Sequence, residues 1–145
     1  MRLGLLTAPF PRRSLKQVAE WASSEHFEML EVACWPAAGG ERRRYAGTSH
    51  IDVTQVDVGA VRDLLDRNGL EISSLAYYPN NLHPDTAERR AANAHLKRVI
   101  DAAAKLEVGI VAPSSDATGR RTSRTTSASS GRSGRSSSTT RSRAA

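Results

Sequence analysis

The sequence predicts an α/β protein built on a parallel sheet, and two observations support this prediction. Within residues 1–112, short apolar segments alternate with longer segments in which apolar residues recur at helical spacing. From residue 113 onward the chain contains no Leu, Ile, Val, Phe, Tyr, Trp or Met. Strands that alternate with helices are typical of a parallel sheet wound right-handedly. We therefore expect four strands and three helices in residues 1–112, followed by a tail at residues 113–145.

The first predicted strand is the apolar segment RLGLLT at residues 2–7, which Pro9 and Pro11 terminate. Ser14 is suited to cap the following helix, because its hydroxyl can accept a hydrogen bond from a free backbone N–H. The apolar residues of this helix recur at helical spacing and are Leu15, Val18, Ala19 and Ala22. The second predicted strand is MLEVACW at residues 29–35, just before Pro36.

A long polar segment then leads to the second helix, which ends where Gly69 can adopt a left-handed conformation. The apolar residues of this helix are Val58, Val61, Leu64 and Leu65. LEISSLAYY at residues 70–78 is the third strand, with Pro79 as its end, and Asp85 can cap the third helix. The apolar face of that helix is predicted to contain Ala92, Leu96, Val99, Ile100 and Ala103. A fourth strand begins with EVGIV at residues 107–111.

Two architectures fit this order, an open doubly wound sheet and a closed (β/α)₈ barrel. The first strand–helix junction, APFPRRS, has no glycine-rich phosphate fingerprint, which disfavours the dinucleotide-binding form of the open sheet. A closed barrel needs eight units and typically about 250 residues. Residues 1–112 could supply only the first half of such a barrel.

Four segments follow one another in order: MRLGLLTAPFP, FEMLEVACWP, LEISSLAYYPNNLHPD and HLKRVIDAAAKLEVGIV. Together they resemble the sugar phosphate isomerase/epimerase family of xylose isomerase-like TIM barrels. The resemblance covers residues 1–111 and implies a (β/α)₈ TIM barrel. Members of the family continue through further strands, so residues 1–112 are expected to be the amino-terminal half of the barrel.

The resemblance implies an enzyme that isomerises or epimerises a sugar, a sugar phosphate or a related polyol with the help of a divalent metal. In the family the metal ligands come from later strands, so no catalytic or metal-binding residue is assigned here. We expect this chain to be a truncated, inactive form without a cofactor. One alternative is a fragment of a metal-dependent AP endonuclease-like barrel, which would need a basic DNA groove. Another is an RNA-binding protein that uses the basic tail.

The tail is predicted to be disordered, because 17 of its 33 residues are Ser or Thr and it cannot form an apolar core. It carries seven Arg against the single Asp116, whereas residues 1–112 hold 14 basic and 14 acidic side chains. The net charge of +6 therefore belongs to the tail. The predicted barrel half has no basic bias that would indicate a nucleic-acid partner.

A one-base displacement of the reading frame accounts for the composition of the tail. If serine is encoded by TCN codons, the neighbouring frame reads NTC, which always encodes Phe, Leu, Ile or Val. Five serines then become apolar residues at helical spacing: Ser123, Ser127, Ser130, Ser133 and Ser137. We therefore predict that residues 113–145 are translated out of frame after a frameshift near codon 112.

Strand alternation places Glu31 and Trp35 on one face of the second predicted strand and Cys34 on the other. The functional interpretation puts Glu31 inside the barrel and Trp35 at its mouth, as a wall for a sugar ring. In the structural alternative, Glu31 pairs with a cation or hydrogen-bond donor and Trp35 packs at the rim. Tyr77 and Tyr78 cannot both face inward, and we take Tyr78 as the residue that contacts substrate.

His83 lies in the loop after the third predicted strand, on the face where barrel enzymes bind their substrates. It is a candidate substrate contact or, in the AP endonuclease-like alternative, a residue that could help to hold a metal. The structural alternative is an ordinary loop histidine. His95 is expected to face solvent, because polar residues surround it in the sequence. Cys34 is expected to be a small, buried and unactivated side chain.

A single cysteine excludes an internal disulfide and fits a reducing compartment. The chain begins without a signal-peptide pattern and contains no apolar segment of membrane-spanning length. These features predict a cytoplasmic protein without a membrane partner. An open half barrel exposes an apolar inner face and two unpaired strand edges, so we also predict self-association or aggregation.

Overall fold

The computed structural model describes residues 1–36 and 49–114 of the 145-residue chain. These residues form β1 (Gly4–Leu6), α1 (Leu15–Ser24), β2 (Met29–Ala33), α2 (Val58–Asn68), β3 (Glu71–Asn80), α3 (Thr86–Leu106) and β4 (Val111–Ser114). The predicted alternation of four strands and three helices is confirmed. The predictions of disorder and of out-of-frame translation concern residues 113–145, and residues 115–145 lie outside the described part of the chain.

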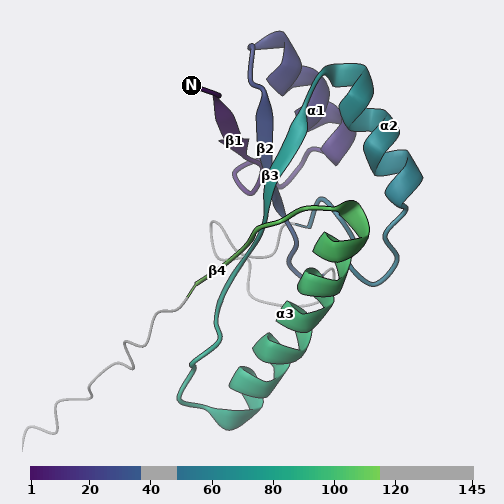
Figure 1. Cartoon of the computed structure of the whole chain (residues 1–145). Coiled ribbons are helices and arrows are strands. Elements are labelled where there is room, and N and C mark those ends of the chain that lie inside the picture. Colours follow the sequence, from purple (N-terminus) through teal and green to yellow (C-terminus); the bar gives the residue numbers. More distant parts are fainter. Residues whose placement is uncertain (37–48, 115–145) are drawn as a thin grey trace, which may run out of the picture.

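The four strands form one sheet in the order β1-β2-β3-β4, and every neighbouring pair is parallel. Strands that are consecutive in the chain are therefore neighbours in space, each connected by one helix. All three helices lie on the same side of the sheet (Figure 1). A parallel sheet with sequential strands and helices on one face is an arc of an α/β barrel.

The core lies between the sheet and the helices. Leu30 and Val32 of β2 and Leu75 of β3 are fully buried, and the residues next to them along each strand face the other way. On the helix side the core is completed mainly by small and branched residues, namely Ala19, Ala22, Leu65, Val99, Ala102 and Ala103. The opposite face of the sheet carries the less buried Leu6 and Glu31 and the exposed Tyr78.

Helix ends follow the predicted capping chemistry. The Ser14 hydroxyl accepts a hydrogen bond from Gln17 N, and the Gln17 side chain accepts one from Ser14 N, which together form a capping box. Oδ1 of Asp85 accepts hydrogen bonds from the first turn of α3. Gly69 ends α2 with a φ of 64°, in the left-handed region that a glycine adopts without a Cβ clash.

Several predicted strand boundaries were wrong. β1 and β2 are shorter than predicted and end at Leu6 and Ala33 instead of residues 7 and 35. β3 does not stop at Pro79 but continues to Asn80, because the β3–β4 register shifts between Tyr77 and Asn80 and the ladder needs no N–H from the proline there. β4 begins at Val111 instead of residue 107, because α3 extends to bury Leu106 and Glu107 serves as its cap.

The β2–β3 pair contains a bulge that decides which β3 residues share a face with β2. Ile72 is paired with Leu30, but Ser74 rather than Ser73 is paired with Glu31. The extra residue, Ser73, donates a hydrogen bond from its hydroxyl to Leu30 O at 3.1 Å. After the bulge the even-numbered residues of β3 share the face of Glu31.

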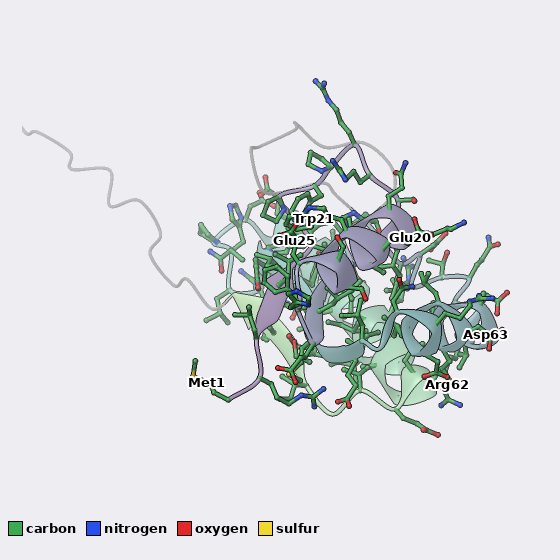
Figure 2. The ribbon with its side chains drawn as sticks, turned by 90° about the horizontal axis from the view of Figure 1, so that it is seen from above. Met1, Glu20, Trp21, Glu25, Arg62 and Asp63 are labelled. Carbon is green, nitrogen blue, oxygen red and sulfur yellow. The ribbon has the colours of Figure 1, made fainter. Side chains whose placement is uncertain are left out.

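Charged residues cover the outer surface of the helices, as Figure 2 shows for Glu20 and Glu25 near α1 and for Arg62 and Asp63 on α2. Met1 lies at the opposite side of the molecule from Arg62 and Asp63, next to β1. The β1 edge of the sheet is therefore far from α2. None of the described helices combines the length and the apolar character that crossing a bilayer requires.

Candidate functional site

Glu31 and Tyr78 meet on the sheet face that the helices leave uncovered. The Tyr78 hydroxyl donates a hydrogen bond to Oε1 of Glu31, which joins the carboxyl end of β3 to the middle of β2. Burial raises the pKa of Tyr78, and the hydrogen bond to the Glu31 carboxylate raises it further. The phenol is therefore held protonated as a donor, and the second carboxylate oxygen of Glu31 has no other hydrogen bond within the described residues.

Trp35 lies immediately after β2 and stands against both tyrosines of β3. Its ring is 5.4 Å from the Tyr78 ring and 6.2 Å from the Tyr77 ring, in edge-on arrangements. Trp35 is only 5% exposed, whereas Tyr78 is 37% exposed. The aromatic surface open to a ligand at this position therefore belongs to Tyr78, with Trp35 as its support.

Tyr77 and Tyr78 point to opposite faces, as strand alternation predicts. Tyr77 is buried on the helix side, where its ring is 4.6 Å from the His95 ring. Burial also raises the pKa of Tyr77. Tyr78 is the tyrosine that lies beside Glu31.

His95 does not face solvent, so that prediction was wrong. The side chain is 6% exposed, and its Nε2 lies 2.8 Å from the carbonyl oxygen of Cys34. The buried face of α3 is formed by Ala92, His95, Val99, Ala102, Ala103 and Leu106. The spacing of Ala92, His95 and Val99 could have revealed this burial, because it places His95 in the apolar stripe of the helix. Ile100, which was predicted to lie on the apolar face, is 50% exposed.

Cys34 is buried on the helix side of the sheet, as predicted. Its thiol donates to Val32 O at 3.4 Å, and burial raises the pKa of the thiol to about 12. A thiol with this pKa is neutral at physiological pH and is a poor nucleophile. Cys34 therefore contributes packing, and its backbone links β2 to its surroundings.

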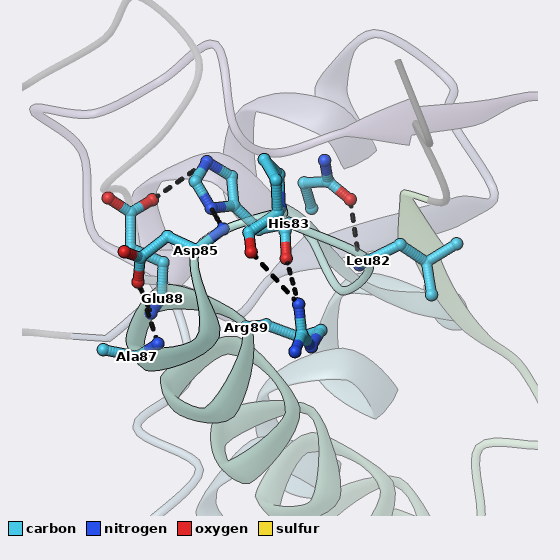
Figure 3. Close-up of polar contacts among 8 residues, drawn as sticks. Leu82, His83, Asp85, Ala87, Glu88 and Arg89 are labelled. Carbon is cyan, nitrogen blue, oxygen red and sulfur yellow. Dashed lines mark hydrogen bonds and ion pairs between the residues drawn. The ribbon is translucent and has the colours of Figure 1, made fainter. Parts of the chain in front are cut away.

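His83 lies in the loop just before α3, and its polar contacts are with this loop and the first turn of α3 (Figure 3). Its Nδ1 accepts a hydrogen bond from Asp85 N at 3.1 Å, and its Nε2 lies 3.2 Å from Oε2 of Glu88. Arg89 donates to the His83 carbonyl oxygen at 2.7 Å. Hydrogen bonds from Glu88 N and Ala87 N lower the pKa of Asp85. Both ring nitrogens of His83 thus serve the local structure of this loop.

Three of the four predicted site residues therefore form one cluster, which we call the Glu31 cluster: Glu31, Trp35 and Tyr78. Within the described part of the chain, no hydrogen bond, ion pair or ring contact joins His83 to this cluster. The Glu31 cluster lies at the carboxyl ends of parallel strands, where α/β barrels place their chemistry.

Comparison with known proteins identifies the family. The sequence profile described as "Xylose isomerase-like TIM barrel" matches residues 19–133. This chain belongs to the xylose isomerase-like TIM barrel family. The match extends past residue 112 into the serine-rich segment, so it does not mark a boundary at that residue.

A solved structure supports the barrel fold. The chain is similar to D-psicose 3-epimerase crystallised in the presence of D-fructose, with a TM-score of 0.54 and 20% sequence identity. The alignment covers 78% of this chain and 37% of that epimerase, so the chain spans well under half the length of this relative. No curated protein gave a significant match.

The xylose isomerase-like family is expected to use a divalent metal, and we tested whether the described residues could hold one. No group of three or more His, Cys, Asp or Glu side chains within residues 1–36 and 49–114 is arranged to bind a metal ion. Glu31 stands alone as a carboxylate in its cluster and already accepts a hydrogen bond from Tyr78. The described residues therefore do not fit the metal.

The described cavities lie away from the Glu31 cluster. One of about 370 Å³ is lined by residues such as Leu65, Leu70 and Leu106, at the end of the barrel arc where β3 begins. Another of about 220 Å³ lies near the start of α2 and includes His50 and Asp57. The first cavity lies at the amino ends of the strands, opposite to the end at which barrels bind substrate. The second cavity lies at the carboxyl end of β2, but none of its lining residues belongs to the Glu31 cluster.

Proposed function

We propose that this chain carries part of the sugar-binding surface of a barrel enzyme that isomerises or epimerises a sugar, a sugar phosphate or a related polyol. In this proposal the Glu31 carboxylate accepts hydrogen bonds from sugar hydroxyls, and the exposed Tyr78 ring packs against the apolar face of the sugar. Trp35 supports Tyr78 from behind. His83 is proposed as a more distant contact at the rim.

The observation that carries this proposal is the hydrogen bond between Tyr78 and Glu31 beside the Trp35 ring. A carboxylate next to an aromatic surface suits a sugar, because sugars present hydroxyl groups at their edges and C–H groups on their faces. The family membership and the likeness to an epimerase crystallised with D-fructose agree with this chemistry.

We further propose that residues 1–145 bind sugar without converting it. Isomerisation and epimerisation require groups that move a proton between carbon atoms and stabilise the charge that develops. The Glu31 cluster offers one carboxylate and one phenol whose pKa is raised. These two groups suit hydrogen bonding to a sugar better than removal of a proton from one of its carbon atoms. The remaining groups of the reaction would have to come from other residues of a complete barrel.

Saturation-transfer NMR on the full chain with D-fructose and D-psicose tests the binding. We expect transfer from aromatic protons to the sugar, reduced in Tyr78→Ala and Glu31→Gln and unchanged in Trp21→Phe. Trp21 packs between Phe10 and Phe27 at 5.3 and 6.0 Å and is therefore a matched aromatic control. Equal transfer in all four proteins would show that the Glu31 cluster does not bind the sugar.

The absence of turnover is tested separately by incubating the full chain with D-fructose or D-psicose and added Mg²⁺, Mn²⁺ or Co²⁺. We expect no conversion above that of the buffer with metal alone. Metal-dependent conversion that Glu31→Gln abolishes would overturn the proposal that the chain is inactive. It would still support the proposal that the Glu31 cluster binds the sugar. This assay therefore separates the two parts of the proposed function.

We also propose that residues 113–145 are translated out of frame, which would explain their serine-rich composition. The proposal rests on the apolar stripe that TCN serines would give in the neighbouring frame. Nucleotide sequencing across codon 112 tests it, with the expected result that the neighbouring frame stays open through codon 145. A stop codon in that frame within the tail would contradict the proposal.

A further inference from the structure

We infer that His95 of α3 is a positioning residue for the Glu31 cluster, because it fixes the peptide bond that carries Trp35. The consequence for ligand binding rests on the proposed sugar-binding function. The positioning itself is independent of any ligand. No feature of the sequence had assigned a role to this histidine.

The first contact is a hydrogen bond to the backbone. His95 Nε2 lies 2.8 Å from the Cys34 carbonyl oxygen, and since a carbonyl can only accept, Nε2 carries the proton. The carbonyl carbon of Cys34 is bonded to the nitrogen of Trp35, and the peptide bond between them is planar. Fixing this oxygen therefore fixes the direction in which the chain leaves β2 and the place of the Trp35 Cα.

The same peptide segment is held from the sheet side. Cys34 N donates to Ala76 O at 2.9 Å, so β3 holds the amide of Cys34 while α3 holds its carbonyl. β2 itself ends at Ala33. His95 thus holds the chain just beyond β2.

The second contact runs through aromatic rings. The His95 ring is 4.6 Å from the Tyr77 ring, and the Tyr77 ring is 6.2 Å from the Trp35 ring. Trp35 in turn meets Tyr78 at 5.4 Å. One buried side chain of α3 therefore supports Trp35 both through the backbone and through Tyr77, and Trp35 supports the exposed ring of Tyr78.

Two substitutions separate these contacts. His95→Gln retains an N–H donor at a similar distance from the backbone, so the hydrogen bond to the Cys34 carbonyl can persist. His95→Phe retains a ring against Tyr77 but has no donor, so the buried Cys34 carbonyl loses its partner. His95→Asn has a donor on a shorter side chain and provides a second variant if His95→Phe does not fold.

The measurement is ¹⁹F NMR of the full chain labelled with 5-fluorotryptophan. The chain has two tryptophans, Trp21 and Trp35, so two resonances are expected. A Trp21→Phe variant assigns the two resonances. We expect His95→Phe or His95→Asn to shift or split the Trp35 resonance while the Trp21 resonance stays in place, and His95→Gln to restore it. An unchanged Trp35 resonance in a folded His95→Phe or His95→Asn protein would overturn the inference.

Ser23→Ala controls for a general loss of stability. The Ser23 hydroxyl donates to Asn68 O at 2.8 Å, which links α1 to the end of α2 without contacting Trp35. This variant is expected to lower the melting temperature and leave the Trp35 resonance unchanged. A Trp35 shift in Ser23→Ala equal to that in His95→Phe would mean that the resonance reports stability alone and would refute the positioning role.

A titration with D-fructose then links the inference to the proposed function. We expect the dissociation constant to rise about tenfold in His95→Phe, as for the loss of one hydrogen bond that orders a site, and to recover in His95→Gln. If the wild-type chain binds no sugar, the proposed function fails and the ¹⁹F result still decides the positioning role. If binding is intact in a His95→Phe protein whose Trp35 has moved, Trp35 does not shape the site.

Discussion

The Tyr78 hydroxyl donates its hydrogen bond to the carboxylate of Glu31, a residue 47 positions earlier in the chain. This bond connects the carboxyl end of β3 with the middle of the neighbouring parallel strand β2, on the face of the sheet that the helices do not cover. It defines the candidate site, because it brings an acceptor and an aromatic ring together where a barrel enzyme binds its substrate.

Tyr78→Phe should remove a phenol that titrates above the ordinary range. Burial and the hydrogen bond to Glu31 raise the pKa of Tyr78, so the folded protein favours the protonated phenol. The stabilising contribution is therefore complete below the unfolded pKa of about 10 and is lost as the pH rises through the folded pKa. Ultraviolet absorbance measured against pH should show that Tyr78→Phe lacks the part of the phenolate signal that appears well above pH 10 in the wild-type protein. Disappearance of a component near pH 10 instead would contradict the assignment.

Thr7→Val should destabilise the protein by about 1–3 kcal/mol, because it leaves a buried N–H without an acceptor. Thr7 is fully buried after β1, and its Oγ1 accepts a hydrogen bond from Ala33 N at 2.9 Å. Valine has a similar shape and no acceptor. The matched control is Thr7→Ser, which keeps the hydroxyl and should retain most of the stability. Urea unfolding measures both, and equal losses in the two variants would show that packing of the methyl group dominates.

The Cys34 thiol should be inert in the folded protein. Burial raises its pKa to about 12, so the folded state favours the neutral thiol and its stabilising contribution falls as the pH rises from about 9 toward 12. We expect no reaction with Ellman's reagent at pH 8 in buffer and one thiol per chain after unfolding in guanidinium chloride. Rapid modification of the native protein would show that the segment after β2 opens.

The chain should self-associate through the uncovered face and edges of its sheet. β1 and β4 are the outer strands of the described sheet, and the exposed apolar side chains near them include Leu3 and Ile110, at 51% and 60% exposure. Sedimentation velocity should show oligomers whose fraction increases with concentration, reduced in Leu3→Lys and Ile110→Lys. Ile100→Lys, at an equally exposed position on α3, should have a smaller effect. A monomer at all concentrations would refute this prediction.

Local signals in the sequence were enough to predict most of the fold. Ser14, Gly69 and Asp85 sit at helix ends where their side chains or backbone satisfy free polar groups, so each marked a boundary by chemistry. The alternation of strands with helices predicted the parallel arrangement, because a helix between two strands returns the chain to the end of the sheet where the first strand began. The ends of the strands could not be predicted from local signals. Pro79 is tolerated inside β3 because the β3–β4 register shifts at this point, and this shift arises only when β3 pairs with β4.

The candidate site was predicted in part. Alternation along β2 placed Glu31 and Cys34 on opposite faces, and the structure confirms this. The burial of His95 was not predicted, because its polar sequence neighbours indicate solvent exposure. Its helical spacing from the buried Ala92 and Val99 indicates the opposite. Its partner is a backbone carbonyl 61 residues away, and no side-chain pattern reports such a contact.

The bulge at Ser73 has a consequence for the two adjacent tyrosines. If the same residues paired without a bulge, the pairing of Ile72 with Leu30 would continue as Ser73 with Glu31, and odd-numbered positions would follow on that face. Tyr77 would then stand beside the Glu31 carboxylate, and Tyr78 would turn toward α3. The one extra residue at this bulge thus decides which of the two phenols faces Glu31. Deleting Ser73 itself should leave Tyr78 beside Glu31, because Ser74 would then follow Ile72 directly and keep its pairing with Glu31.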